Sequence, residues 1–144
     1  MNTKKIHSGL WVLLVALVCA PLNAKTLSQA SPNGNIIFSV SDDAGAPSYS
    51  VKYRDKDIIK ASQLGLEFNH VDGFVRDLKI TSHSTASADT TWEQPWGEQR
   101  LMRDHHNELL VSFSGVHNTK KIMQLRVRVF DDGLGFRYEV PKQK

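Results

Sequence analysis

The sequence predicts an all-β domain, an antiparallel β-sandwich, that follows an N-terminal signal peptide. After residue 24, apolar and polar side chains alternate with a period of two in nearly every segment. No segment there repeats apolar residues at the spacing of an amphipathic helix. Turn-forming clusters separate the alternating segments, and about seven or eight strands joined by hairpin turns pack best as two antiparallel sheets.

The first 24 residues have the three parts of a signal peptide. Lys4 and Lys5 supply positive charge, residues 10–20 form an apolar run, and Pro21 and Ala24 mark the helix break and the cleavage position. The apolar run is shorter than the roughly 20 residues that cross a bilayer, which makes an uncleaved membrane anchor the lesser alternative. We therefore expect a periplasmic or secreted protein.

Cleavage after this segment limits the chemistry open to the mature domain, residues 25–144. Cys19 is the only cysteine, so the mature domain has no disulfide and no cysteine-based zinc site. Lipid attachment at Cys19 is a minor alternative, because Val18 precedes it where a small residue is preferred. The formal charge falls from +3 to +1 when Lys4 and Lys5 are removed, and this charge gives no reason to expect nucleic-acid binding.

The first predicted strands are short segments between turns. Residues 31–35 form a turn cluster with an Asn-Gly pair, and residues 36–41 alternate apolar and polar side chains. A loop at residues 42–47 leads to a half-buried strand at residues 49–54. The charged residues that follow turn the chain into residues 58–59, which complete a hairpin.

The middle of the chain has a less regular pattern. Residues 64–69 alternate and are expected as a strand, and residues 74–81 are expected as a longer strand with a weaker pattern. Residues 82–91 are rich in Ser, Thr and Ala and have no apolar anchor, so we expect a surface loop there.

The C-terminal part carries the clearest alternation. Strands are expected at residues 109–113, 122–130 and 136–140, with a tight Asp-Asp-Gly turn before the last one and Pro141 after it. The polar side chains of these strands are expected to face solvent. The side chains expected in the core are Met123, Leu125, Val127, Val129, Phe136 and Tyr138. The last strand leaves an open sheet edge, which indicates a part of a longer protein.

Residues 91–108 depart from this rhythm and concentrate aromatic and polar groups. They hold two of the three tryptophans together with three Glu, one Asp, two Arg and two His. Trp rings stack on sugar rings, while carboxylate, amide and guanidinium groups bind sugar hydroxyls. The candidate carbohydrate-binding residues are Trp92, Trp96, Glu98, Arg103, His105 and Asn107. In the alternative interpretation, Trp92 and Trp96 close the end of the sandwich and the charges form surface pairs of little energetic value.

No catalytic or metal-binding residue is assigned in this segment. Hydrolysis of a glycosidic bond needs two carboxylates roughly 5 to 10 Å apart, and the sequence places no two acids across a sugar. The acids of suitable type are Glu93, Glu98, Asp104 and Glu108. His105 and His106 would point to opposite faces of an extended segment, so they do not chelate one ion together.

Several groups of residues resemble one known family when they are taken in order. They are residues 31–34 (SPNG), 49–53 (YSVKY), 64–66 (LGL), 92–98 (WEQPWGE), 103–109 (RDHHNEL) and 130–138 (FDDGLGFRY). In this order and spacing they resemble the N-terminal domain of glycoside hydrolase family 97, a family of bacterial α-glucosidases and α-galactosidases. His106 departs from the family pattern, which has an aromatic residue, usually Tyr, at this position.

The resemblance implies a partial β-supersandwich, similar to galactose mutarotase, as the incomplete N-terminal domain of a larger enzyme. In the family this domain packs against a catalytic (β/α)8 barrel, which holds the catalytic acids and most ligands of a calcium ion.

The resemblance therefore implies that the chain is a non-catalytic fragment of a calcium-dependent α-glycosidase that acts on α-glucosides or α-galactosides. It would reach oligosaccharides or polysaccharides only through the full-length enzyme, and no calcium is expected on this chain. The alternative is a free-standing periplasmic carbohydrate-binding sandwich, and a third possibility is a structural fragment without a ligand.

Overall fold

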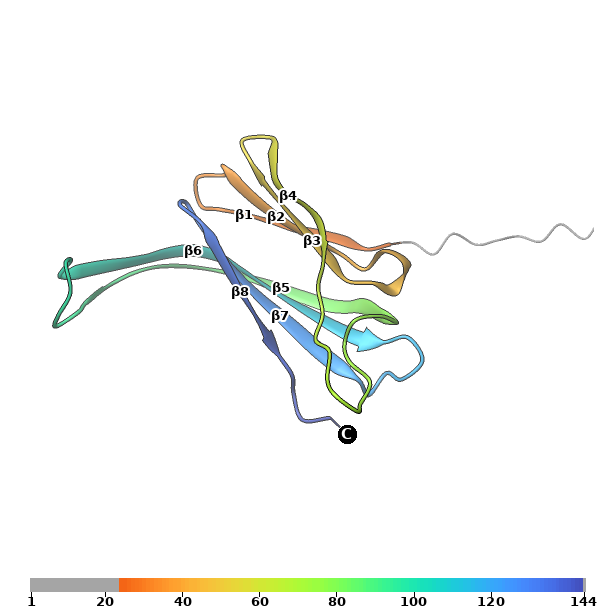
Figure 1. The fold of residues 1–144 in the computed structure, drawn as a ribbon. Helices are drawn as coiled ribbons and strands as arrows, with labels where there is room; N and C mark the ends of the chain where they lie inside the picture. The colour runs from red at the N-terminus through yellow and green to blue at the C-terminus, as the bar shows by residue number, and fades with distance from the viewer. Residues whose placement is uncertain (1–23, 144) are drawn as a thin grey trace, which may run out of the picture.

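Two four-stranded antiparallel sheets face each other in the computed structural model, which describes residues 24–143 (Figure 1). The first sheet has the strand order β1-β2-β3-β4, and the second has the order β5-β6-β7-β8. The strands are β1 (Thr26–Ala30), β2 (Ile36–Ser41), β3 (Ser48–Tyr53), β4 (Lys56–Gln63), β5 (Leu78–Glu93), β6 (Leu101–Gly115), β7 (Ile122–Phe130) and β8 (Leu134–Glu139). This arrangement confirms the antiparallel β-sandwich predicted from the sequence.

Helical structure is limited to one short element in the described part of the chain, the 3-10 turn η1 (Asp43–Gly45). Over residues 24–143, no helix has the length and apolar character needed to cross a membrane. The predicted signal peptide, residues 1–24, lies outside the described residues except for its last position.

The first sheet follows from the alternation in β2 and from a tight turn after β3. Ile36, Phe38 and Val40 share one face of β2, which agrees with the predicted alternation, and all three are buried. Arg54 and Asp55 form the turn between β3 and β4, with φ of 46° and 66°. Positive φ at both central residues matches the twist of a two-residue hairpin, so β4 begins directly after this turn, earlier than expected.

The second sheet has its strongest alternation in β7, which lies between β6 and β8. Met123, Leu125, Val127 and Val129 are fully buried, as predicted. Burial of one side chain of this size stabilises a fold by roughly 1.5–3 kcal/mol. The inner face of β7 is therefore a main source of the stability of the sandwich.

The predicted burial of Phe136 is wrong, because 38% of this residue is exposed. It lies on β8, which ends the order of the second sheet and so leaves one side of the ring uncovered. The other side packs on Tyr49 and Phe38 of the first sheet, with ring centroids 5.4 Å and 6.5 Å away. Tyr138 is half-buried on the same strand, and its hydroxyl accepts a 3.0 Å hydrogen bond from the Gly65 N–H.

The strand predicted at residues 64–69 is also wrong, because the chain between β4 and β5 is irregular. The backbone there folds back on itself, and Leu66 and Phe74 exchange main-chain hydrogen bonds. A Cβ at Gly73 would collide with the Leu66 carbonyl, so this close approach requires glycine. The alternation in this segment reflects the burial of side chains such as Leu64, which is 2% exposed.

The surface loop predicted at residues 82–91 is wrong as well, because these residues belong to β5, which starts later than the strand predicted at residues 74–81. They pair with β6 in an unbroken register from Ser82, opposite Ser112, to the end of the strand. β5 covers little of the core after its first residues, so polar side chains suit both of its faces.

A hairpin of β5 and β6 extends past the other strands, as Figure 1 shows. β6 pairs with β7 only as far as His106, which stands opposite Phe130. Beyond that point, in the described residues, β6 pairs with β5 alone. We call residues 89–105 the arm.

A β-bulge lies where β5 leaves the sandwich. The pairing slips between Ile80 and Ser82, and the Thr81 hydroxyl donates a 3.1 Å hydrogen bond to the Ser112 carbonyl. Before the bulge, even-numbered residues such as Leu78 face the core, whereas after it the odd-numbered residues share the inner face of β6. Bulges bend a strand and increase its twist.

Candidate functional site

The six candidate residues lie on the arm and at its base. Their positions are the end of β5 for Trp92, the turn at the tip for Trp96 and Glu98, and β6 for Arg103, His105 and Asn107. One hairpin therefore supplies the whole set. The alternation of side chains along each strand nevertheless divides it between two faces.

The two tryptophans are exposed at the far end of the arm. Trp92 lies on the face that continues the outer face of the second sheet, opposite Met102. Trp92 is 52% exposed, and Trp96 in the turn is 84% exposed. The interpretation that both rings close the end of the sandwich is therefore wrong. Glu98 is exposed in the same turn, next to Gly97, which has a φ of 128°.

Arg103, His105 and Asn107 point to the inner face, the side of β6 that carries its buried residues. Arg103 forms a double hydrogen bond with Asp89, with distances of 2.7 Å from Nε and 2.8 Å from Nη2. The Asn107 side-chain nitrogen donates a 3.0 Å hydrogen bond to the Ala30 carbonyl on β1. These polar groups are thus engaged within the protein.

His105 contacts a turn rather than its neighbours on the arm. Its Nδ1 lies 3.9 Å from an Asp131 carboxylate oxygen in the turn between β7 and β8. The other Asp131 oxygen accepts a 2.8 Å hydrogen bond from the Asn33 N–H in the turn after β1. The structure therefore brings three candidates together on the inner face and leaves Trp92 on the outer face.

His105 and His106 point to opposite faces of β6, as predicted for an extended segment. His106 is buried, its Nδ1 contacts an Asp104 carboxylate oxygen, and its ring packs on Phe130 with centroids 5.1 Å apart. His106 thus serves as an aromatic packing residue. In residues 24–143, no three His, Cys, Asp or Glu side chains come together as metal ligands.

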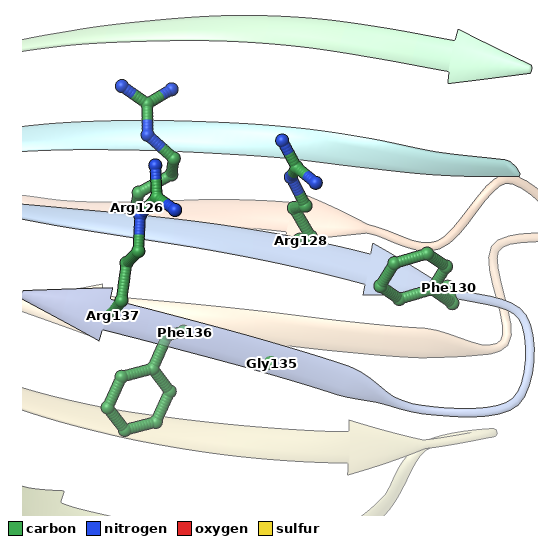
Figure 2. Close-up of a pocket in the computed structure, with 6 residues that line it drawn as sticks. All are labelled: Arg126, Arg128, Phe130, Gly135, Phe136 and Arg137. Atoms are coloured by element: carbon green, nitrogen blue, oxygen red, sulfur yellow. The ribbon is translucent and has the colours of Figure 1, made fainter. Parts of the chain in front are cut away.

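A second cluster of polar side chains covers the outer faces of β6, β7 and β8. Arg126 Nε donates a 2.7 Å hydrogen bond to Glu139, and Arg126 Nη1 contacts Glu108. Arg128 Nε donates to Glu108 at 3.0 Å, and Arg137 Nε donates to Glu139 at 2.9 Å. We call these five residues the arginine–glutamate cluster. Figure 2 shows its three arginines on one side of the strands.

An open hollow of about 250 Å³ lies beside this cluster. Phe130, Gly135 and Phe136 line it together with the arginines. Gly135 stands opposite Arg128 in the register of β7 and β8, and its missing side chain leaves space there. Phe136 points to the other side of the sheet, towards the first sheet (Figure 2). The hollow thus places guanidinium groups beside an aromatic ring.

The arginines keep both glutamates of the cluster ionised. The pKa of Glu139 is lowered to about 2, first by the hydrogen bond from Arg126 and then by the hydrogen bond from Arg137. Burial of the carboxyl acts in the opposite direction but is outweighed. Burial opposes ionisation of Glu108, but the hydrogen bonds from Arg128 and Arg126 outweigh it and lower the pKa of this carboxyl. A general acid needs a raised pKa near the working pH. These carboxylates are therefore suited to accept hydrogen bonds rather than to donate protons.

The sequence predicted a solvent-facing polar side for β7 but did not predict the cluster. A signal was present, because an Arg-x-Arg segment (residues 126–128) and an Arg-x-Glu segment (residues 137–139) flank a tight hairpin turn. A hairpin brings such segments side by side, where opposite charges interact across strands. Glu108 joins the cluster because of the register between β6 and β7. The length of the turn between these two strands does not set that register.

Comparisons with known proteins identify the family of this domain. The family described as Glycosyl-hydrolase 97 N-terminal matches residues 30–144. A solved glycoside hydrolase family 97 enzyme from Pseudoalteromonas sp. strain K8, in complex with panose, shares 42% sequence identity and a TM-score of 0.78. The match covers 81% of this chain and 18% of the enzyme. A family 97 enzyme from the same strain in complex with acarbose gives the same values.

A more distant neighbour is the crystal structure of a β-arabinopyranosidase, with 27% identity, a TM-score of 0.73 and the same two coverages. The chain thus spans 18% of the length of each of these solved chains. The matched region runs from the end of β1 through β8. On the evidence of this match and of the 42% identity, the chain belongs to the glycoside hydrolase family 97 N-terminal family.

Proposed function

We propose that residues 25–144 form the non-catalytic N-terminal β-sandwich portion of a calcium-dependent α-glycosidase, an exported enzyme of which this chain is one part. The observation that carries the proposal is the 42% identity with a family 97 enzyme of which this chain matches 18%. In this proposal the domain supports a catalytic (β/α)8 barrel, and the barrel binds and cleaves the saccharide.

The chemistry of the described residues supports a non-catalytic role. The two carboxylates of the arginine–glutamate cluster, Glu108 and Glu139, are held by arginines and have lowered pKa values. A glycosidase requires a proton donor on one side of the scissile bond and a second carboxylate on the other side. In the arginine–glutamate cluster both carboxylates instead accept hydrogen bonds from arginines, which neutralise their charge. Such pairs suit a structural role.

The neighbours favour α-glucosides as the substrates of the whole enzyme. The Pseudoalteromonas family 97 enzyme binds panose, a saccharide of α-linked glucose, in its solved complex. A sandwich of similar shape occurs in a β-arabinopyranosidase, with a TM-score of 0.73. Since enzymes named for different sugars share this domain, we propose that the choice between α-glucosides and α-galactosides depends on residues outside it.

Calcium is assigned to the barrel in this proposal. Calcium sites use six to eight oxygen ligands, several of them carboxylates. The part of the chain that the structure describes gathers no three His, Cys, Asp or Glu side chains for an ion.

An activity assay tests the proposal directly. The purified chain is incubated with p-nitrophenyl α-glucoside and p-nitrophenyl α-galactoside, once with calcium and once with a chelator. We expect no release of nitrophenol above background, while the intact Pseudoalteromonas family 97 enzyme serves as the positive control. Calcium-dependent turnover by the chain alone would overturn the non-catalytic role.

A second candidate function is a free-standing carbohydrate-binding sandwich. The exposure of Trp92 and Trp96 at the end of the arm favours it, because exposed aromatic rings are common platforms for sugars. Titration with panose and maltooligosaccharides, followed by Trp emission, separates the two functions. A saturable change that disappears in Trp96→Ala supports a binding module, and an unchanged emission supports the proposed role as a domain of a larger enzyme.

A further inference from the structure

The outer flank of β5 is a long, exposed strand edge. β5 ends the order of the second sheet, so in residues 24–143 only the flank that faces β6 has a strand partner. The first sheet lies against the neighbouring strands, with β1 on β6 and β2 on β7. All but one of residues 82–90 are exposed. This segment therefore presents a row of main-chain N–H and C=O groups to solvent.

This edge lacks the features that usually keep edge strands apart. Natural sheets protect their edges with lysines, prolines, bulges within the strand or a covering segment. Residues 82–90 contain no lysine, arginine or proline, and Asp89 is their only acid. The bulge of β5 lies before Ser82 and leaves the following residues in regular pairing with β6. An edge of this kind accepts a further strand.

The segment is complementary to a second copy of itself. In an antiparallel pair related by a twofold axis through Ala86, His83 stands opposite the partner's Asp89. The remaining positions place small polar residues or alanine opposite one another. No like charges meet, and symmetry forms the His–Asp pair twice. In each pair the two residue numbers differ by an even number. Side chains that share one face of β5 therefore also share one face of the joined sheet.

We propose that the protein forms a twofold dimer through antiparallel pairing of residues 82–90 of β5 with the same residues of a second copy. The pairing joins the two second sheets into one continuous sheet. It also places the base of each arm beside the partner's β5, which supports a two-stranded extension that has few contacts of its own. The inference goes beyond the proposed function, and it rests on the exposed edge of β5 in residues 24–143 and on the complementarity of that edge to a second copy.

The position of the twofold axis allows a sharp test. In Ala86→Lys or Ala86→Glu, each new side chain faces its own copy, so like charges meet at the centre of the interface. By sedimentation velocity we expect the wild-type chain at about twice the monomer mass and each variant at the monomer mass. An equimolar mixture of the two variants should restore the dimer, because opposite charges then meet. Gln99→Lys, in the turn of the arm, is the control for added charge and should leave the dimer intact.

Each other outcome overturns the proposal. A monomeric wild type, a dimer that persists in Ala86→Lys, or a mixture that stays monomeric is incompatible with pairing centred on this residue. A dimer that is lost in Trp96→Ala but kept in Ala86→Lys would place the contact at the tip of the arm. Circular dichroism confirms that each variant is folded, and hydrogen exchange should show slower exchange of amides in residues 82–90 of the wild type than in either variant alone.

Discussion

Arg126 and Glu139 are joined across β7 and β8 by a hydrogen bond of 2.7 Å between Nε and Oε1. The bond lowers the pKa of Glu139 from its usual 4.5 to about 2. A carboxylate with a lowered folded-state pKa contributes stability that is complete above its unfolded pKa and is lost as the pH falls through its folded pKa. Acid should therefore weaken the link between these strands from pH 4.5 down to about pH 2.

Replacement of Glu139 should flatten this acid dependence. We expect Glu139→Gln to lower the free energy of unfolding at pH 7 by about 1 kcal/mol, less than the pKa shift alone implies because solvent screens this pair. The variant should then lose less stability than the wild type between pH 4.5 and 2, which urea unfolding at several pH values measures. Glu98→Gln, in the turn at the tip of the arm, is the control. Parallel pH curves for wild type and Glu139→Gln would contradict the assignment.

A charge inside the sandwich should prevent folding. Val127 is fully buried in the centre of β7, and an isolated carboxylate there has no partner for its charge. The cost of burying this charge is as large as much of the total stability of a domain, which is about 5–15 kcal/mol. Val127→Asp should therefore show no cooperative thermal transition. Gln99→Asp, in the exposed turn at the tip of the arm, should melt like the wild type. A soluble, cooperatively melting Val127→Asp would refute the placement of β7.

Two phenylalanines in contact should differ in their effect on stability. Phe38 is fully buried, whereas Phe136 is 38% exposed at the sheet edge. Phe38→Ala should lower the free energy of unfolding by about 3–5 kcal/mol, and Phe136→Ala should cost clearly less because its ring loses less buried area. Urea denaturation of the two variants measures the difference. Equal losses would mean that the edge of β8 is covered in solution.

Tryptophan emission should report on the arm rather than on the core. Trp92 and Trp96 are the tryptophans of residues 25–144, and both are exposed. Acrylamide should quench them readily in the folded chain, and urea unfolding should shift their emission little while circular dichroism records the transition. A large shift on unfolding would show that the rings are buried against another surface.

Export should leave a chain that starts at Lys25. The run of residues 10–20 and the small residue at Ala24 form a signal-peptide pattern. After expression in a bacterial host, mass spectrometry of the periplasmic fraction should find the chain without its first 24 residues. Recovery of the full-length chain from the membrane fraction would favour the anchor alternative.

The fold could be predicted from the sequence wherever a strand covers the core. In β7 the alternation of Val127 with its polar neighbours sets both the strand and its buried face, because one side must leave water. The same rule failed for residues 82–91, where neither face covers a core and the backbone pairing with β6 alone makes the strand. It also failed at Leu64 and Gly65, where buried side chains and a strand-like pattern belong to an irregular segment.

The candidate site was less predictable because it depends on register. The sequence placed Trp92 and Arg103 in one segment, but the pairing of β5 with β6 sends their side chains to opposite faces. The approach of Asn107 to Ala30 and of Asn33 to Asp131 joins residues far apart in the chain. Such contacts follow from how two sheets stack, and no local pattern of residues encodes the stacking.

The bulge at Thr81 gives a single residue control over where the arm points. Even-numbered residues face the core before Thr81, and odd-numbered residues face the same side after it. Thr81 is the one extra residue that accounts for this change. Deletion of Thr81 would leave Ile80 in the core and His83 on its present face, yet it would straighten the strand between them. The direction of the arm is thus set by the bulge and can change without a change in the packing of the sandwich.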